Sequence, residues 1–284
     1  MNNRNLFSYS RLEDLPNELF YQIQLYLTLN DLYKAFSDLN SRFDGLLMSM
    51  VDLYYEIRSS TIDQRLTTSC LASHIMSICI PNNSNAVSIA TIFSNVRSII
   101  FHRPIRLIPK TLSTVERIKF DLSLVRLKQA IPLCTSIFSN QFRSLTSFSI
   151  LHRKTRFVGR WKILIYSIRS QCLTLTEFVF DIQPTIEWKT FERLLEKMPH
   201  LQRLIIRKLN TRDQWSLNGL SVTFRNHMPH LNYLSLCITI LDTNKVIENY
   251  NNSHLIHPLF KHIESKIRNS RKLYSTTIIK SSND

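Results

Sequence analysis

Apolar residues recur along the chain at two spacings, one typical of helices and one typical of strands. Near the N-terminus they recur at intervals of four residues, which predicts a helix with one apolar stripe formed by Leu15, Leu19, Ile23 and Leu27. Residues 28–30 interrupt this pattern, and Asn30 or Asp31 can cap a second helix. A break at Asn40 then precedes a third short apolar run. The sequence therefore predicts three short helices near the start of the chain.

The start of the first helix carries its own signals. Pro16 suits a first helical turn, where its missing N–H costs nothing. Asp14 is a plausible cap, and Glu18 is favoured at the positive end of the helix dipole. Three helices of this length bury little surface alone, so we expect a partner or a neighbouring domain to cover the apolar stripe.

These residues resemble the F-box, a motif that docks on the small adaptor subunit of cullin–RING ubiquitin ligases. The resemblance covers about 40 of the 284 residues and departs from many F-boxes by lacking a Cys or Trp in the second helix. It is carried by Leu15-Pro16-x-Glu18-Leu19-x-x-x-Ile23-x-x-Tyr26-Leu27, followed by Asn30-Asp31-Leu32 and Leu39-Asn40-x-Arg42-Phe43. It implies that the adaptor is bound by Leu15, Pro16, Leu19, Ile23, Leu27 and Leu32. The alternative is a capped helical hairpin that packs on its own chain.

A hexamer, apolar-x-x-apolar-x-apolar, recurs through the body of the chain. Its copies begin at Val96, Val115, Leu145, Leu175, Leu201 and Leu231. The tetrapeptide Met198-Pro199-His200-Leu201 returns before the last copy as Met-Pro-His-Leu at 228–231. Each Pro ends a helical pattern and each Leu begins a strand pattern.

Helical patterns separate some of the hexamers. Trp188, Phe191 and Leu194 recur at helical spacing, and Trp161 and Leu164 do the same before the fourth hexamer. One short strand plus one helix per roughly 26 to 30 residues resembles a degenerate leucine-rich repeat, in which parallel strands line a concave face. F-box proteins with such a C-terminal solenoid form a recognised subfamily, and this order of parts resembles them. The alternative is a generic α/β domain with parallel strands.

The sequence thus predicts an α/β fold in three parts: a three-helix F-box over 10–50, an irregular leucine-rich-repeat-like solenoid of short parallel strands and helices over 51–243, and a C-terminal cap and frayed tail over 244–284. We expect five or six repeats, the first of them unclear between 50 and 95. A helix is predicted after Pro258 from Leu259, Phe260, Ile263 and Ile267. Residues beyond Ser275 are expected to be frayed.

Alternation of side chains along a strand should point the third and fifth hexamer positions, and the residue after the hexamer, to the concave face. Their mixture of charged, hydroxyl and apolar groups suits protein recognition. The candidate target-binding residues are Arg117, Lys119, Glu177, Arg203, Arg207 and Tyr233. A basic cluster after the third hexamer is a candidate contact for nucleic acid or an acidic protein, or a nuclear import signal: Arg153, Lys154, Arg156, Arg160 and Lys162.

Charge and cysteine content narrow the function classes. The chain holds 36 Lys and Arg against 21 Asp and Glu, a net charge of +15 that implies anionic partners or an anionic compartment. Residues 1–50 carry −2 and the remainder +17, which indicates two units with different partners. Five widely spaced cysteines without a C-x-x-C favour a reducing cytoplasmic or nuclear setting. The uncharged stretch 66–96 is broken by Pro81, so we expect no membrane span.

Catalysis has little support. Three glycines in separate loops exclude a P-loop and a dinucleotide-binding fingerprint. The pairs His227-x-x-His230 and His254-x-x-His257 lack the Glu or the Cys pair of a zinc site, so neither a metal nor another cofactor is expected. A cysteine-based transfer enzyme stays open, because its Cys and His would be distant in sequence.

The sequence therefore predicts a non-enzymatic substrate-recognition subunit of a cullin–RING ligase, located in the cytoplasm or the nucleus. Its F-box would bind the small adaptor subunit and its solenoid an unknown protein target. The alternative is a basic, repeat-built protein that binds nucleic acid and has no ubiquitin-ligase role. The mixed charge of the predicted concave face makes nucleic acid the less favoured partner, since a continuous basic track would be expected for it.

Overall fold

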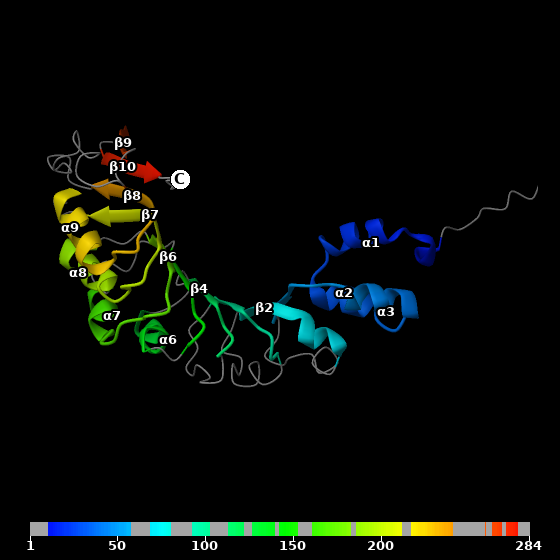
Figure 1. Ribbon diagram of the computed structural model, residues 1–284. Helices are drawn as coiled ribbons and strands as arrows, with labels where there is room; N and C mark the ends of the chain where they lie inside the picture. Colours follow the sequence, from blue (N-terminus) through cyan, green and yellow to red (C-terminus); the bar gives the residue numbers. More distant parts are fainter. Residues whose placement is uncertain are drawn as a thin grey trace, which may run out of the picture.

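The computed structural model describes residues 11–57, 69–80, 93–102, 113–121, 127–139, 142–152, 161–182, 186–211, 217–240, 259, 263–268 and 271–277. These residues form an α/β fold around one ten-stranded sheet with the order β1-β2-β3-β4-β5-β6-β7-β8-β10-β9 (Figure 1). The first eight strands are parallel, as predicted: β1 (Leu53–Glu56), β2 (Ile75–Ile80), β3 (Ser98–Phe101), β4 (Arg117–Asp121), β5 (Ser147–His152), β6 (Glu177–Ile182), β7 (Arg203–Thr211) and β8 (Tyr233–Ile240).

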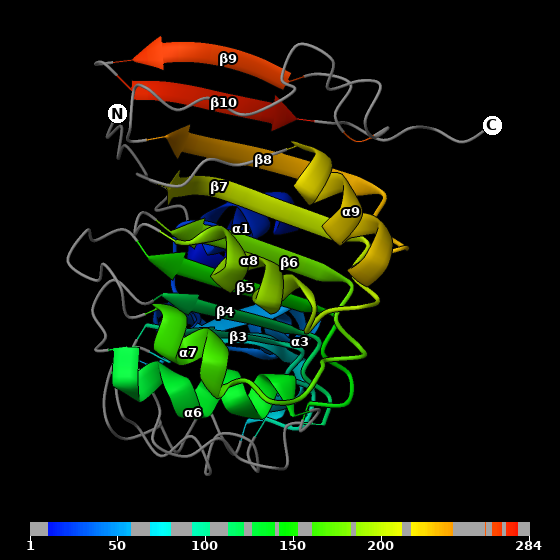
Figure 2. The same ribbon diagram turned by 90° about the vertical axis from the view of Figure 1, so that its left-hand side faces the viewer.

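The sheet is curved, and its helices lie on one face. The helices α6 (Leu127–Phe138), α7 (Trp161–Ser167), α8 (Trp188–Leu195) and α9 (Leu217–His227) lie in front of the strands in Figure 2, and Figure 1 shows that this is the outer, convex face. Over β3 to β8, no described helix lies on the opposite face, which we call the open face. Within the described ranges no helix has the length and apolar character needed to cross a membrane.

The hexamers set the register of the sheet. Their fourth positions pair strand to strand in one continuous row, made of Ile99, Ile118, Phe148, Phe178, Leu204 and Leu234. The first, fourth and sixth positions of all six copies are buried, except for the half-buried Leu231. Apolar residues at these positions therefore fill the layer between sheet and helices, which is the burial that stabilises the fold.

Two strands extend this row beyond the predicted repeats. Ile75, Ile78 and Ile80 of β2 repeat the hexamer in the same phase, since Ile78 pairs with Ile99. Tyr55 of β1 pairs with Ile78 in turn. The region around 50–95, which the sequence left unclear, therefore supplies the first two strands of the sheet.

A buried residue three positions before five of the hexamers completes the repeat. It is Phe93, Phe142, Cys172, Met198 or Met228, and in four of these copies its carbonyl accepts the N–H of the first hexamer residue. The carbonyl of the second hexamer residue accepts two N–H groups of the next repeat; Glu116 O, for example, accepts from Thr146 N at 2.9 Å and from Ser147 N at 3.0 Å. These turns provide hydrogen-bond partners for the backbone N–H and C=O groups just before the strands.

The C-terminal part differs from the prediction. Residues Ile263–Arg268 form β9 and Arg271–Thr277 form β10, an antiparallel hairpin that pairs through β10 with β8. The predicted helix was therefore wrong, because Ile263, Ser265 and Ile267 alternate with charged residues at the strand period of two. β10 also runs past Ser275, where fraying was expected. Residues 244–258 and 278–284 lie outside the described residues.

The N-terminal region forms short helices, as predicted, and they are η1 (Leu12–Asp14), α1 (Asn17–Gln24), α2 (Leu29–Phe36) and α3 (Ser41–Met48). α2 packs on β1, and α3 packs on η2 (Cys70–His74), so the helices and the sheet share one hydrophobic core. Two predicted caps were wrong: Pro16 rather than Asp14 occupies the cap of α1, and Thr28 caps α2 by accepting from Asp31 N at 3.3 Å.

Candidate protein-interaction surfaces

Three phenylalanines form the centre of the N-terminal helical unit. Phe20 of α1, Phe36 of α2 and Phe43 of α3 are all buried, and their ring centroids lie 4.9 to 5.6 Å apart. Aromatic pairs at this distance and these tilts add to the stability gained by burial. Each helix therefore turns one aromatic side chain inward, and the other sides of the helices face away from this centre.

Arg42 of α3 fixes the segment that leads into α1. Its guanidinium donates to the backbone carbonyls of Glu13 and Leu15 and to Asn17 Oδ1, which lies 2.7 Å from Nη2. The planar fork of arginine suits several acceptors at once. Arg42 belongs to the F-box-like motif, and the structure shows that it holds the Leu15-Pro16 opening against α3.

The N-terminal unit exposes an unusual share of apolar side chains. Of thirteen exposed large hydrophobic residues in the described part, nine lie between residues 12 and 54. We call this set the N-terminal apolar surface: Leu12, Leu19, Tyr21, Leu25, Tyr26, Leu39, Met48, Val51 and Tyr54. Scattered apolar residues are normal on a protein surface, but a concentration of them marks an interaction site.

The six predicted adaptor-binding residues divide by burial. Pro16 and Leu19 are exposed, whereas Leu32 is only 4% exposed and belongs to the core. The remaining three, Leu15, Ile23 and Leu27, are half-buried. The predicted stripe of Leu15, Leu19, Ile23 and Leu27 therefore does not form one exposed face. The reason is that α1 ends at Gln24 and packs on the core through Phe20.

The most exposed apolar residues follow the end of α1 and were not among those six. Leu25 is 77% exposed and Tyr26 is 88% exposed. Tyr26 carries a recognisable sequence signal, because it is a large aromatic residue beside the apolar stripe. No sequence signal separated Leu25 from a core residue, since its exposure depends on where α1 ends.

A groove of about 460 Å³ joins part of this surface to the sheet. Residues of α1, α2 and β1, and of the segments after α1 and before β1, line it, including Tyr21, Leu25, Val51 and Tyr54. Gln24 also lines the groove, and its Oε1 is shielded from solvent with no hydrogen-bond partner among the described residues. A partner that donates to this oxygen would relieve a cost of about 1–3 kcal/mol.

The open face brings together distant candidate target-binding residues. Arg117, Ser147, Glu177, Arg203 and Tyr233 pair in one row across β4 to β8. Burial alternates along β4, where Arg117 and Lys119 are exposed and the residues between and after them are buried. Exposed side chains from residues 117 to 233 therefore share one surface, as the hexamer phase predicted.

Part of this row is internally bonded. Glu177 accepts a hydrogen bond from Ser147 Oγ at 2.9 Å and lies 3.2 Å from Arg203 Nε. The Arg203 guanidinium stands 4.2 Å from the ring centroid of Tyr233. These three candidates, Glu177, Arg203 and Tyr233, thus form a connected strip. Arg207 is exposed farther along β7, next to the register shift between Ile206 and Leu209.

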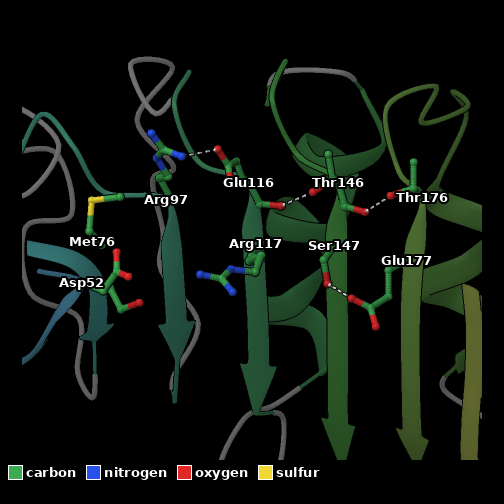
Figure 3. A pocket seen from close by; sticks show the side chains of 10 residues that line it. Asp52, Met76, Arg97, Glu116, Arg117, Thr146, Ser147, Thr176 and Glu177 are labelled. Atoms are coloured by element: carbon green, nitrogen blue, oxygen red, sulfur yellow. Dashed lines mark hydrogen bonds and ion pairs between the residues drawn. The ribbon is translucent and has the colours of Figure 1, made fainter.

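A polar cavity of about 510 Å³ lies at the amino ends of the strands on this face (Figure 3). Its charged lining residues are Asp52, Arg97, Glu116, Arg117 and Glu177. Its remaining lining residues are Met76, Ser77, Thr146, Ser147 and Thr176. Both charge signs and several hydroxyl groups are therefore available to a partner in this cavity.

Three of the cysteine thiols, Cys79, Cys134 and Cys172, are buried in the core. Burial raises the pKa of Cys134 to about 12 and also raises the pKa values of Cys172 and Cys79. Such thiols stay protonated at neutral pH and make poor nucleophiles. Among the residues that the structure describes, no group of three His, Cys, Asp or Glu side chains could hold a metal ion.

Several other candidate residues have ordinary contacts or lie outside the described part. His230 stacks on His200, and His227 Nε2 lies 3.8 Å from Glu196 Oε1. Lys162 pairs with Glu187 at 3.5 Å. The rest of the basic cluster, at 153–160, and the pair His254 and His257 lie outside the described residues.

Comparison with known proteins adds no relative. No protein-family model matches the chain, and no curated protein matches it significantly. Function is therefore inferred from the N-terminal motif and from the two surfaces described above.

Proposed function

We propose that this protein is the substrate-recognition subunit of a cullin–RING ubiquitin ligase and performs no bond chemistry itself. The observation that carries the proposal is the N-terminal apolar surface, most of whose residues lie in the segment whose sequence resembles an F-box. Large exposed side chains such as Leu25 and Tyr26 are suited to act as anchors in a protein interface.

In this proposal the two surfaces have separate partners. The N-terminal apolar surface binds the small adaptor subunit, and the curved sheet serves as a leucine-rich-repeat-like solenoid whose open face binds the target. The shared core of helices and sheet supports a fixed spacing between the two partners. Holding the target beside the charged ubiquitin-conjugating enzyme raises the effective concentration of its lysines. A reducing compartment, the cytoplasm or the nucleus, is part of the proposal.

The rival function, nucleic-acid binding, has less support from the open face. Glu116, Asp121, Glu177 and Asp181 stand among its cations, and two of these carboxylates pair directly with arginines. A phosphate backbone would be repelled by the carboxylates, and its binding would weaken steeply with salt. A predominantly apolar adaptor interface should depend little on salt.

The proposal is tested by affinity capture of the full chain from cell extract with mass-spectrometric identification, followed by reconstitution with the purified adaptor. We expect a stoichiometric complex with the adaptor and its cullin, formed equally at roughly 0.1 and roughly 0.5 M salt, because screening affects apolar contacts little. Failure of the purified chain and adaptor to associate would refute the ligase assignment. Salt-sensitive recovery of nucleic acid instead would support the rival.

A further inference from the structure

The cations of the polar cavity differ in whether they are neutralised. Arg97 Nη1 lies 3.3 Å from Glu116 Oε1, and Arg203, at its border, lies 3.2 Å from Glu177. Arg117 lies between these two pairs on the same face and forms no ion pair with any residue that the structure describes. Lys119, two residues farther along β4, is likewise exposed and without an ion pair in the described part. Arg117 and Lys119 are therefore two exposed cations on β4 that no carboxylate of the described residues pairs with.

The surroundings of Arg117 leave its guanidinium open to a ligand. Its register partners are Ser98 on β3 and Ser147 on β5, whose side chains are too short to cover it. Figure 3 shows the guanidinium directed along the cavity, with dashed lines joining its neighbours to one another but none reaching Arg117. Arginine recognises carboxylates and phosphates through two parallel N–H donors. The cavity is large enough, at about 510 Å³, to admit a side chain.

The charge of the cavity distinguishes between these two anions. Asp52, Glu116 and Glu177 line it together with Arg97 and Arg117, and Arg203 at its border pairs with Glu177, so the charges of these six residues cancel. A phosphate, which carries nearly two negative charges, would be repelled by these carboxylates more strongly than a carboxylate would. The balance favours a ligand with one negative charge at Arg117.

We propose that Arg117 binds a carboxylate of the target protein in this cavity and that Lys119 binds a second one. The spacing of the two cations is about 7 Å, since a strand advances about 3.3 Å per residue. An extended target segment lying along β4 would match it with acidic residues two positions apart, an acidic-x-acidic motif. The inference rests on the proposed function, because it assigns the chemistry of the target. Glu177, which accepts from Ser147 and pairs with Arg203, lies on the wall of the site toward β7.

The test is selection of a random-dodecapeptide display library on the immobilised full chain at physiological salt. We expect enrichment of acidic-x-acidic peptides, and binding of a selected peptide should fall at least about tenfold in Arg117→Ala, the loss expected for a hydrogen bond to a charged group. Arg117→Lys should recover little, because an ammonium cannot form the paired donors. Selection of peptides without acidic residues would overturn the proposal.

Two controls make the test specific. Arg117→Glu with Lys119→Glu should abolish peptide binding, whereas Arg169→Glu with Lys189→Glu, the same charge change at exposed positions outside the open face, should reduce it less than about threefold because distant surface charges are screened. If both double variants lost the same peptide affinity, the effect would come from net charge alone, and this result would contradict a carboxylate-binding site at Arg117. A phosphoserine peptide that binds tenfold more tightly than its glutamate counterpart would contradict the carboxylate assignment.

Adaptor binding by the same variants separates this inference from the proposed function. If the chain binds the adaptor but selects no acidic peptides, the acidic-target inference fails and the ligase assignment stands. If it selects acidic peptides through Arg117 but does not bind the adaptor, the ligase assignment fails and the carboxylate site stands.

Discussion

Leu204 of β7 and Leu234 of β8 are register partners in adjacent parallel strands, and both are completely buried. They occupy the same position in two successive hexamers, each of which follows the same Met-Pro-His sequence. Their neighbour Arg203 points to the open face, where its side chain is 48% exposed. One residue of displacement along β7 thus separates the core from the surface.

This relationship predicts how stability responds to substitution. Leu204→Ala and Leu234→Ala should each lower the free energy of unfolding by about 2–5 kcal/mol, because each leaves a cavity in the core. Arg203→Ala should cost only about 1 kcal/mol, because its ion pair and its contact with Tyr233 are partly exposed. Urea denaturation measures all three. Equal losses for Arg203→Ala and Leu204→Ala would show that the strand phase is wrong.

Arg42 should position the start of α1 for its partner. Arg42→Ala removes donors from the carbonyls of Glu13 and Leu15 and from Asn17, so the segment before α1 should become sensitive to protease and adaptor affinity should fall. Arg42→Lys should rescue little, since one ammonium cannot replace the planar fork. Limited proteolysis and calorimetry check the two effects. Lys34→Ala, at an exposed position of α2, is the matched control and should change neither.

Cys134 should make the protein less stable in alkali. Its folded-state pKa of about 12 lies above the ordinary thiol value of 9.0 because the side chain is fully buried. As the pH rises, the thiol loses its proton in the unfolded chain before it does so in the folded chain. The free energy of unfolding is therefore unaffected by this thiol well below pH 9 and declines as the pH rises from 9 toward 12. Between pH 9 and 10 the thiol should account for about 1 kcal/mol of the loss.

Cys134→Ala provides the comparison for this alkaline effect. The variant lacks the titrating group, so its free energy of unfolding should fall by about 1 kcal/mol less than that of the unchanged chain over the same pH interval. Guanidinium denaturation at the two pH values measures the difference. Parallel losses in both proteins would show that the thiol does not stay protonated in the folded state.

The strands from β3 to β8 could be predicted because each contains the apolar positions of the hexamer at the same spacing. The hexamer of β2, beginning at Ile75, is equally regular, but it lies in a hydroxyl-rich stretch with no helical pattern before or after it. This strand was therefore not predicted. The β9 segment was mistaken for a helix because Ile263 and Ile267 are four residues apart, which satisfies both periods. Pairing of β10 with β8 is a tertiary contact that the local pattern does not encode.

The candidate surfaces were predictable to different degrees. On the sheet, alternation alone placed Arg117 and Lys119 outward, because a strand has only two faces. On α1, an interval of four was compatible with either a buried or an exposed stripe, and packing of Phe20 with Phe36 and Phe43 decided between them. The ion pairs that separate Arg203 from the unpaired Arg117 depend on neighbouring strands, so the sequence alone could not reveal them.

The central claim is that the N-terminal apolar surface binds the small adaptor subunit of a cullin–RING ligase. Isothermal titration calorimetry of the full chain with purified adaptor tests it most directly, using Leu19→Ala with Tyr26→Ala, two exposed residues whose truncation leaves the core intact. Ile163→Ala, at an exposed position on α7, is the matched control. We predict adaptor binding by the unchanged chain and by Ile163→Ala, and a loss of at least about 30-fold in the double variant, as expected for interface anchors. Absence of binding by the unchanged chain, or equal affinity in the double variant, would contradict this account.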